Sequence, residues 1–267
     1  MSINDILSVQ GMLPFLLDKD AAGNITVHSS LESTNKTAKE LAITGAENGT
    51  IVIADCQTAG KGRYGRSFFS PPGHGIYMSF VLRPSQRHWV GSPTLVTTYA
   101  AVSVCEAIEA TTDKMPRIKW VNDIFLDGKK ICGILTEAVT DIESGKMQWI
   151  VVGIGINFIT PNAGFPEEIK NIAGSIFSEG KPTITRNKLA AEIINRMLVF
   201  ESQWGSKPIL AEYKKRLMMI GKRVLITGLN ETFEATAIDI DDIGRLIVNK
   251  DNGEILSLSA GEVSLGK

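Results

Sequence analysis

The spacing of hydrophobic residues predicts an alternation of strands and helices over roughly the first 217 residues. β-Branched and aromatic runs predict strands at residues 50–54 and 76–82 and a buried strand at residues 149–158. The Asp127-Gly128 pair lies between two further β-like runs and predicts a hairpin. Apolar residues at helical spacing predict helices over residues 34–42, from Pro93 onward, and over residues 186–204 and 207–217. The segment between the first two strands is rich in glycine, and a loop of that length is usually functional or disordered.

The pattern changes from Met218 onward. Short β-rich runs at residues 223–227, 233–239, 245–249 and 254–259 are separated by turn residues. A succession of short strands over about 50 residues is typical of a small β-barrel. We therefore predict two domains, residues 1–216 and residues 217–267.

Composition and charge exclude several classes of protein. The 267 residues carry 28 Lys and Arg against 29 Asp and Glu, a formal net charge of −1, and 43% of the residues are hydrophobic. This is ordinary globular usage and argues against disorder or a collagen-like repeat. A near-neutral chain gives no global support for binding to nucleic acid or membrane, so a basic site must be local.

Targeting and metal signals are also missing from the sequence. No basic residue precedes Lys19, and the most apolar stretch, residues 149–159, is interrupted by glycines and too short to span a membrane. The three cysteines lack CxxC spacing and predict free thiols in a reducing compartment. The histidines have no partner at i+4 or neighbouring cysteine, so we expect no transition metal held by the protein. The chain is expected to be soluble and cytoplasmic.

The segment from Asp55 to Ser67 combines three glycines with Lys61, Arg63 and Arg66. It satisfies the dinucleotide-binding fingerprint and nearly satisfies a P-loop, but both motifs must open a helix, and the sequence FFSPPG that follows cannot start one promptly. Glycines let the backbone approach a ligand, and three cations suit a phosphate group. The segment indicates an anion site, with a mobile, solvated basic loop as the alternative.

A second polar cluster follows the strand-like run at residues 117–120. Asn122 and Asp123 are suited to a phosphate-bound Mg²⁺, because that ion prefers oxygen ligands and takes few of them from protein. An ordinary turn cap is the alternative for this short motif.

Two lysines open the second arm of the predicted hairpin. Alternation separates Lys129 from Lys130 onto opposite faces of the strand, and strict alternation places Lys130 with Cys132 and Ile134. One of the two lysines is then expected to face a cleft, with a pair of surface lysines as the alternative.

Four blocks of sequence, in this order and spacing, resemble the biotin protein ligases. The blocks are Ser33-Thr34-Asn35, residues 57–66 (QTAGKGRYGR), residues 119–135 and residues 153–157 (GIGIN). The resemblance implies an α+β fold in which residues 1–216 form a mixed β-sheet catalytic domain, related to class II aminoacyl-tRNA synthetases and lipoate ligases. It also implies that residues 217–267 form a small C-terminal SH3-like β-barrel.

The same resemblance implies an ATP-dependent ligase that acts on a biotin carboxyl carrier protein. Such an enzyme activates biotin with ATP to biotinyl-5′-AMP and pyrophosphate, and then transfers biotin to a lysine of a carrier domain of a biotin-dependent carboxylase. A carboxylate that attacks an α-phosphate must overcome like-charge repulsion, so cations aimed at the phosphoryl group are the main requirement. No covalent enzyme intermediate is expected.

The resemblance also assigns roles to individual residues. Lys130 is expected to hold the biotin carboxylate and the α-phosphate, and Arg63 to contact the adenylate, so both are the expected catalytic residues. Mg²⁺ is expected near Asn122 and Asp123 without being held by the protein alone. The expected biotin-binding residues are Ser33, Thr34, Asn35, Gln57, Lys61, Gly62, Arg63, Lys130 and Gly133, and the expected ATP-binding residues are Arg63, Arg66, Lys119, Asn122, Asp123, Lys130 and Asn157.

The chain departs from the family pattern at two positions. Val121 stands where proline is usual, and Phe68 stands where tryptophan is usual, which alters the packing expected over the nucleotide or biotin. Lys61, where many members have arginine, keeps the charge and loses the bidentate fork. The loop glycines imply flexibility that closes over the acyl-adenylate, so we predict a poorly ordered loop in the ligand-free protein.

Three other functions remain open on the sequence alone. A lipoate or other acyl-carrier ligase would use the same adenylation chemistry on a different acid. A DNA-binding repressor would need an N-terminal winged helix, and about 30 residues before Ser33 are too few for one, so we expect a monofunctional ligase. A pure biotin-binding module is the third alternative. The expected partner is a biotin carboxyl carrier protein or domain, paired through an edge strand, with no DNA and no membrane; the protein is expected to be a monomer or homodimer.

Overall fold

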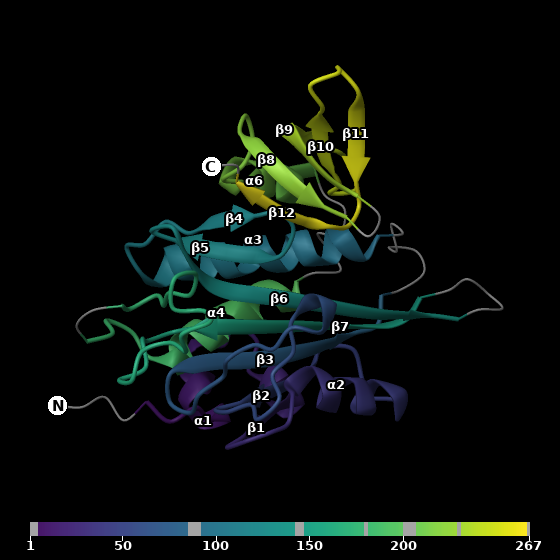
Figure 1. Cartoon of the computed structure of the whole chain (residues 1–267). Helices are drawn as coiled ribbons and strands as arrows, with labels where there is room; N and C mark the ends of the chain where they lie inside the picture. Colours follow the sequence, from purple (N-terminus) through teal and green to yellow (C-terminus); the bar gives the residue numbers. More distant parts are fainter. Residues whose placement is uncertain are drawn as a thin grey trace.

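The computed structural model describes residues 5–84, 92–141, 147–178, 181–199, 207–228 and 231–265. Over these residues the chain forms a seven-stranded mixed sheet and a separate five-stranded antiparallel sheet. Figure 1 shows the smaller sheet, in light green and yellow, beside the edge of the larger one. The α+β class and the mixed catalytic sheet predicted from the sequence are confirmed.

The large sheet has the strand order β1-β2-β3-β7-β6-β5-β4. The β1–β2 pair is parallel and every other neighbouring pair is antiparallel. The predicted strands and the Asp127-Gly128 hairpin are confirmed, and both turn residues have positive φ, as this type of turn requires. The strand bounds are β1 Ile25–His28, β2 Thr50–Ala54, β3 Gly75–Leu82, β4 Arg117–Lys119, β5 Asp123–Leu126, β6 Lys129–Thr140 and β7 Met147–Asn157.

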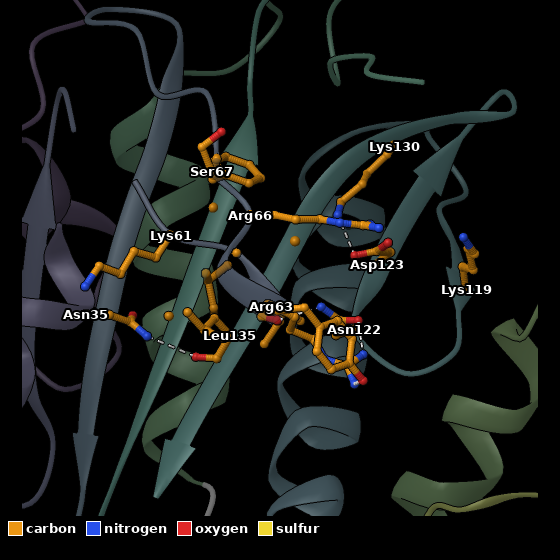
Figure 2. Close-up of a pocket in the computed structure, with 18 of the residues that line it drawn as sticks. Asn35, Lys61, Arg63, Arg66, Ser67, Lys119, Asn122, Asp123, Lys130 and Leu135 are labelled. Carbon is orange, nitrogen blue, oxygen red and sulfur yellow. Dashed lines mark hydrogen bonds and ion pairs between the residues drawn. The ribbon is translucent and has the colours of Figure 1, made fainter. Parts of the chain in front are cut away.

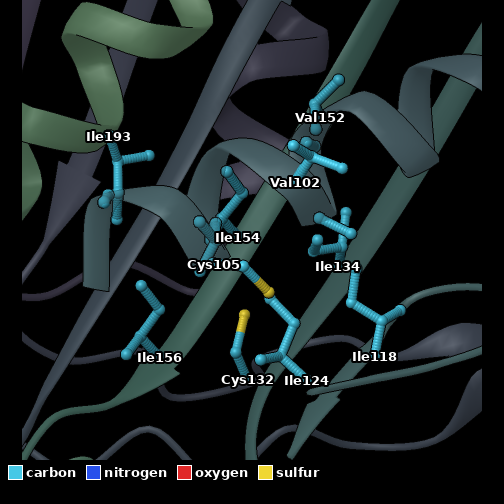
Figure 3. Close-up of a cluster of buried hydrophobic side chains, with 14 of the residues drawn as sticks. Val102, Cys105, Ile118, Ile124, Cys132, Ile134, Val152, Ile154, Ile156 and Ile193 are labelled. Carbon is cyan, nitrogen blue, oxygen red and sulfur yellow. The ribbon is translucent and has the colours of Figure 1, made fainter. Parts of the chain in front are cut away.

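Helices cover the two faces of this sheet unequally. On one face α3 (Pro93–Thr111) and α4 (Arg186–Leu198) bury the main core, in which Cys105 of α3 lies among isoleucines and valines of the strands (Figure 3). On the other face α2 (Thr34–Ile43) covers only one end of the strands through Ala38 and Ala42. The uncovered remainder of that face holds the site described below.

The remaining helices largely follow the sequence pattern. The helix predicted from Pro93 begins there and is capped by Ser92, and the helix predicted over residues 207–217 is α6, Lys207–Arg216. Of the helix predicted over residues 186–204, α4 accounts for the part to Leu198, and residues 200–206 lie outside the described residues. Short elements near the start of the chain were missed, namely α1 Val9–Met12, three-residue and five-residue 3₁₀ turns, and β1.

A one-residue irregularity separates the start of β6 from its continuation. Phe125 of β5 pairs with Lys130, whereas the preceding residue of β5 pairs with Cys132, so Ile131 has no partner opposite it. The strict alternation assumed from the sequence was therefore wrong. Cys132 packs in the main core, and Lys130 lies instead on the face of Gly133, whose added Cβ would lie 3.3 Å from the Lys130 ammonium.

The smaller sheet has the order β11-β10-β9-β8-β12. Its first four strands coincide with the four predicted runs, and the short last strand was not predicted. The sheet is attached to the larger domain where Trp120 Nε1 donates to Gly244 O at 3.0 Å and Ile118 pairs with Leu217. The strand bounds are β8 Arg223–Thr227, β9 Thr232–Ile240, β10 Leu246–Asn249, β11 Ile255–Leu258 and β12 Glu262–Leu265.

Two further expectations, and one departure from the family pattern, can be compared with the structure. Cys56, Cys105 and Cys132 are free thiols, as predicted. Among the described residues, no helix is long and apolar enough to cross a membrane. The carbonyl of Val121, at the departure from the family pattern, accepts from the buried Tyr213 hydroxyl at 2.9 Å, so the turn has a hydrogen bond from α6.

Candidate functional site

A pocket opens on the partly covered face of the large sheet. It is bounded by the start of α2, the loop after β2, the β4–β5 turn, the middle of β6 and β7, and residues 261–263 of the smaller domain. Figure 2 shows Lys61 and Asn35 toward one side of this pocket, and Arg66, Lys130 and Asp123 toward the other. The two ends differ in chemistry and are described in turn.

Glycines form the floor of the pocket. On the α2-facing side of β7, Val151 packs under the helix, and the next two residues on that side are Gly153 and Gly155. A Cβ at Gly155 would lie 2.7 Å from the ring of Phe68, so only glycine admits the ring there. Alternate glycines in a buried strand are the signal that something else approaches the backbone closely.

The end of the pocket near α2 carries mainly neutral polar side chains, with Lys61 of the loop beside them. Ser33 occupies the N-cap position of α2, but its side chain makes no capping bond. Instead, the first helical amide, Thr34 N, donates to Gln57 Oε1 at 2.8 Å. Gln57 thus satisfies one helix-terminal donor, and the Ser33 hydroxyl lies in the pocket wall without acting as a cap.

The neutral end continues through buried hydroxyl and amide groups. Ser79 Oγ lies 2.6 Å from Asn35 Oδ1 and 2.8 Å from Thr34 Oγ1. On the loop side, Gln57 Nε2 donates to Ser70 Oγ at 2.9 Å, and the Ser70 hydroxyl donates to the Phe68 carbonyl. One connected hydrogen-bond network therefore joins α2, β3 and the end of the loop.

The opposite end of the pocket is cationic. Lys130 Nζ lies 2.6 Å from Asp123 Oδ1, and Arg63 Nη1 donates to Asn122 Oδ1 at 3.0 Å. Asn122 is itself held because its Nδ2 donates to Ile134 O at 2.8 Å. The two predicted polar clusters, the loop and the β4–β5 turn, thus meet at this end.

Lys119 adds a partly buried cation to the same end. Burial is the largest influence on its side chain and lowers the pKa of Lys119 below its usual value, although the Asp123 carboxylate acts in the opposite direction. An ammonium group that has lost part of its hydration is poised to gain from an anionic ligand.

The smaller domain also contributes to the cationic end. Arg66 Nη2 lies 2.6 Å from Glu262 Oε1, and the Tyr64 hydroxyl accepts from Gly261 N at 3.1 Å. The sequence offered no signal for this contact, because it joins residues nearly 200 positions apart. Arg66 is well exposed and Glu262 is partly exposed, so the pair contributes little to stability and leaves Arg66 free to exchange partners.

The structure brings nearly all predicted site residues together. Asn157 is the exception: it does not line the pocket, and its Nδ2 donates to Gly174 O at 2.9 Å, on the segment that pairs with Lys130. The predicted residues that line the pocket are Ser33, Thr34, Asn35, Gln57, Lys61, Gly62, Arg63, Arg66, Lys119, Asn122, Asp123, Lys130 and Gly133. Lining residues to which the sequence analysis assigned no role are Tyr64, Ser67, Trp120, Ile134, Leu135, Gly153, Ile154, Gly155, Gly261, Glu262 and Val263.

The arrangement suits a substrate with two different ends. The mainly neutral donors and acceptors on one side match an uncharged polar ring, and Arg63, Arg66, Lys119 and Lys130 on the other side match phosphates. A carboxylate lying between them would face a phosphoryl group next to Lys130 and Arg63. This is the geometry that acyl adenylation requires, since charge develops between those groups.

Two family descriptions match the chain. Residues 27–157 match the family described as "Biotin/lipoate A/B protein ligase family", and residues 219–266 match "Biotin protein ligase C terminal domain". The first match contains every predicted site residue, and the second contains Glu262.

Relatives and solved structures agree with these matches. The chain is 36% identical to the bifunctional ligase/repressor BirA of Bacillus subtilis, over 91% of this chain and 74% of that protein. It is 30% identical to the biotin–[acetyl-CoA-carboxylase] ligase of Mycobacterium tuberculosis, over 86% of this chain and 85% of that protein. The fold is similar to that of the biotin protein ligase from Aquifex aeolicus in complex with biotin and ATP, with a TM-score of 0.73, 25% identity, and coverage of 91% of this chain and 99% of that one. The chain belongs to the biotin protein ligase family.

Proposed function

We propose that this protein activates biotin with ATP to biotinyl-5′-AMP and pyrophosphate, and transfers biotin to a lysine of a biotin carboxyl carrier protein. The observation that carries the proposal is the pocket in which a neutral hydrogen-bonding end adjoins a cationic end. The similarity to an enzyme solved with both biotin and ATP supports the same assignment.

The cationic end supplies the chemistry of the first step. Lys130 holds the biotin carboxylate and the α-phosphate together, which offsets the repulsion between two anions. To do so, its ammonium exchanges part of its contact with Asp123 for the substrates. Arg63, fixed by Asn122, contacts the adenylate, and Arg66 and Lys119 bind the remaining phosphates.

The neutral end binds the ureido ring. Its planar donors and acceptors require polar partners, which Ser33, Thr34, Asn35 and Gln57 provide. Lys61 and Gly62 cover this end from the loop, and Gly133 leaves room beside Lys130. Asn157 supports the Gly174 segment beside Lys130 and acts on ATP through that segment instead of by contact.

Mg²⁺ is proposed to arrive with the triphosphate. Among the described residues no group of three or more His, Cys, Asp or Glu is placed to hold a metal. Asn122 uses both ends of its amide within the protein, so Asp123 is the carboxylate with capacity to bind the ion. This donor set fits Mg²⁺ only if phosphates and water supply most of the ligands of the ion. An ion bound in this way would neutralise charge on the leaving pyrophosphate.

The second candidate is a lipoate or other acyl ligase, because the family description includes lipoate ligases. ATP–pyrophosphate exchange measured separately with biotin, lipoate and octanoate distinguishes the candidates. We expect exchange with biotin; exchange with lipoate alone would replace the proposal by its rival. A purely biotin-binding protein would give no exchange with any of the three acids.

The partner and compartment complete the proposal. A biotin carboxyl carrier protein or domain is the proposed acceptor of biotin. It is proposed to bind along an exposed edge strand of the large sheet, such as β1. The protein is proposed to act as a monomer or homodimer and to bind neither DNA nor membrane. Three free thiols support a reducing, cytoplasmic compartment.

A further inference from the structure

Glu137 lies one step beyond the pocket, on the side of β6 that Gly133 and Leu135 also face. It is not a pocket-lining residue, but its two carboxylate oxygens are both engaged: Oε2 accepts from Asn35 Nδ2 at 2.9 Å, and Oε1 accepts from Lys39 Nζ at 2.8 Å. We propose that Glu137, held by Lys39, is a positioning residue that fixes the Asn35 amide in the one orientation that accepts a hydrogen bond from a ring N–H of the acid substrate. The proposal rests on the biotin ligase function proposed above.

Three contacts define the orientation of the Asn35 amide. Its Oδ1 lies 2.6 Å from the Ser79 hydroxyl, while its Nδ2 donates to Leu135 O at 3.2 Å and to Glu137. Rotation of the amide by 180° would turn its oxygen toward the Leu135 carbonyl and the Glu137 carboxylate, both of which only accept. The flipped orientation is therefore excluded, and the carboxylate contributes the stronger of the two repulsions.

This orientation determines what Asn35 offers to a ligand. Both hydrogens of Nδ2 are used inside the protein, so the remaining capacity is an acceptor lone pair on Oδ1. The ureido ring of biotin carries N–H donors. The dithiolane ring of lipoate and the alkyl chain of octanoate carry none. A fixed acceptor therefore favours biotin, and a site built to hydrogen-bond a polar substrate group rejects analogues that lack it.

The charge on Glu137 is maintained by the same contacts. Burial is the largest influence and would raise its pKa, but the hydrogen bonds from Lys39 and Asn35, with the charges of Lys39 and Lys61, lower it below the usual value. The carboxylate is therefore ionised at neutral pH. The hydrogen bond from Asn35 to the ionised carboxylate is fully present at pH values above the ordinary pKa of glutamate. It weakens as the pH falls through the lowered pKa of Glu137.

The variant Glu137→Ala tests the proposal by steady-state exchange kinetics. Loss of a hydrogen bond to a charged group is expected to raise the KM for biotin about tenfold or more. The KM for ATP and kcat are expected to stay within about twofold, and lipoate exchange is expected to rise relative to biotin exchange, since the acceptor is no longer fixed.

Three further variants separate positioning from structural support. Glu137→Gln is expected to restore most biotin affinity, because an amide oxygen still accepts from Asn35. Lys39→Met, at a partly exposed position one turn after Asn35, is expected to raise the KM for biotin by a smaller factor with the fold intact. Glu32→Ala removes a carboxylate that lies just before α2 and pairs with Lys36 of that helix, and is expected to leave the KM for biotin unchanged.

Several results would overturn the proposal. The first two are an unchanged KM for biotin in folded Glu137→Ala and an equal rise of that KM in Glu137→Gln and Glu137→Ala. If Glu137→Ala does not fold, an unchanged KM for biotin in Lys39→Met has the same meaning. A rise confined to the KM for ATP would also contradict the proposal. Absence of biotin exchange in the unmodified protein would instead contradict the proposed function, so the two failures are distinguishable.

Discussion

The two ends of the pocket are built differently. At the neutral end, Asn35 and Gln57 are held by hydrogen bonds from buried partners on strands and helix, and the floor consists of strand glycines. At the cationic end, Arg63 and Arg66 lie on a glycine-rich loop, and their partners include side chains of other segments, namely Asn122 and the partly exposed Glu262 of the smaller domain.

The difference indicates that the two ends have separate roles, selection of the acid at one end and binding of the phosphates at the other. A rigid neutral end sets which acid binds, because its donors and acceptors are fixed before the ligand arrives. A cationic end paired with protein carboxylates can exchange those partners for phosphates as the nucleotide binds and the reaction proceeds.

Removal of the cation beside Asp123 is expected to disable the cationic end. Lys130→Ala should lower the rate of biotin-dependent exchange by about 10²–10³-fold, the usual loss when one preorganised charge-stabilising group is removed. Lys129→Ala is the matched control, because this neighbouring lysine is exposed and its Nζ donates to Asn171 O at 2.7 Å. Comparable losses in both variants would refute the special role of Lys130.

A single methyl group is expected to disrupt the neutral end. A Cβ at Gly153 would lie 1.9 Å from Asn35 Oδ1, so Gly153→Ala forces the amide out of place. The KM for biotin should rise about tenfold, from the loss of one or two hydrogen bonds, with a much smaller change in the KM for ATP. Gly23→Ala, where the added atom meets nothing within 4 Å, serves as the control. A variant that lost ATP affinity equally would show that the two ends are not separable.

The loop is expected to change its accessibility when both substrates bind. Lys61, Arg63 and Arg66 are tryptic sites, and the poorly ordered ligand-free loop stays a prediction from the sequence. Limited trypsinolysis should cut here first, and biotin together with ATP should slow that cleavage severalfold, because closure over the adenylate buries the loop. Equal cleavage rates with and without substrates would remove the proposed closure.

The partly buried Lys119 is expected to lower the stability of the fold and to strengthen ATP binding. Lys119→Met should stabilise the fold by up to about 1 kcal/mol while weakening ATP binding, because the desolvated charge is removed. The lowered pKa of Lys119 also sets how the free energy of unfolding changes with pH. Between the pKa of Lys119 in the folded protein and its ordinary value of 10.5, this side chain is more protonated in the unfolded state, so the free energy of unfolding rises with pH across that window. Thermal unfolding of both proteins at pH 7 and pH 10 checks this, since the rise should be smaller in the variant.

Local sequence pattern predicted much of the molecule. The strands of the smaller domain and the hairpin at Asp127 have the alternation and turn residues that such elements require, and these features act over a few neighbouring positions. The loop and the β4–β5 turn were identified as parts of one site only through their resemblance to a family. Nothing local in either segment specifies that Arg63 contacts Asn122.

What the sequence did not predict depends on contacts between distant segments. The unpaired residue Ile131 reverses the facing of Lys130 relative to Cys132, and strict alternation contains no information about such an irregularity. The approach of Glu262 to the loop depends on how two domains pack. The glycines of the pocket floor are recognisable in the sequence as GIGIN, but the sequence does not specify which side chains pack against them. These are Asn35 at Gly153 and Phe68 at Gly155.

One pocket is proposed to join a ureido-binding end to an adenylating end. Its most direct test is ATP–pyrophosphate exchange by the purified protein, with biotin, lipoate or octanoate as the only acid. We expect exchange that depends on biotin and falls by about two orders of magnitude or more in Lys130→Ala. Exchange driven by lipoate or octanoate but not biotin, or biotin exchange unaffected by loss of Lys130, would contradict it.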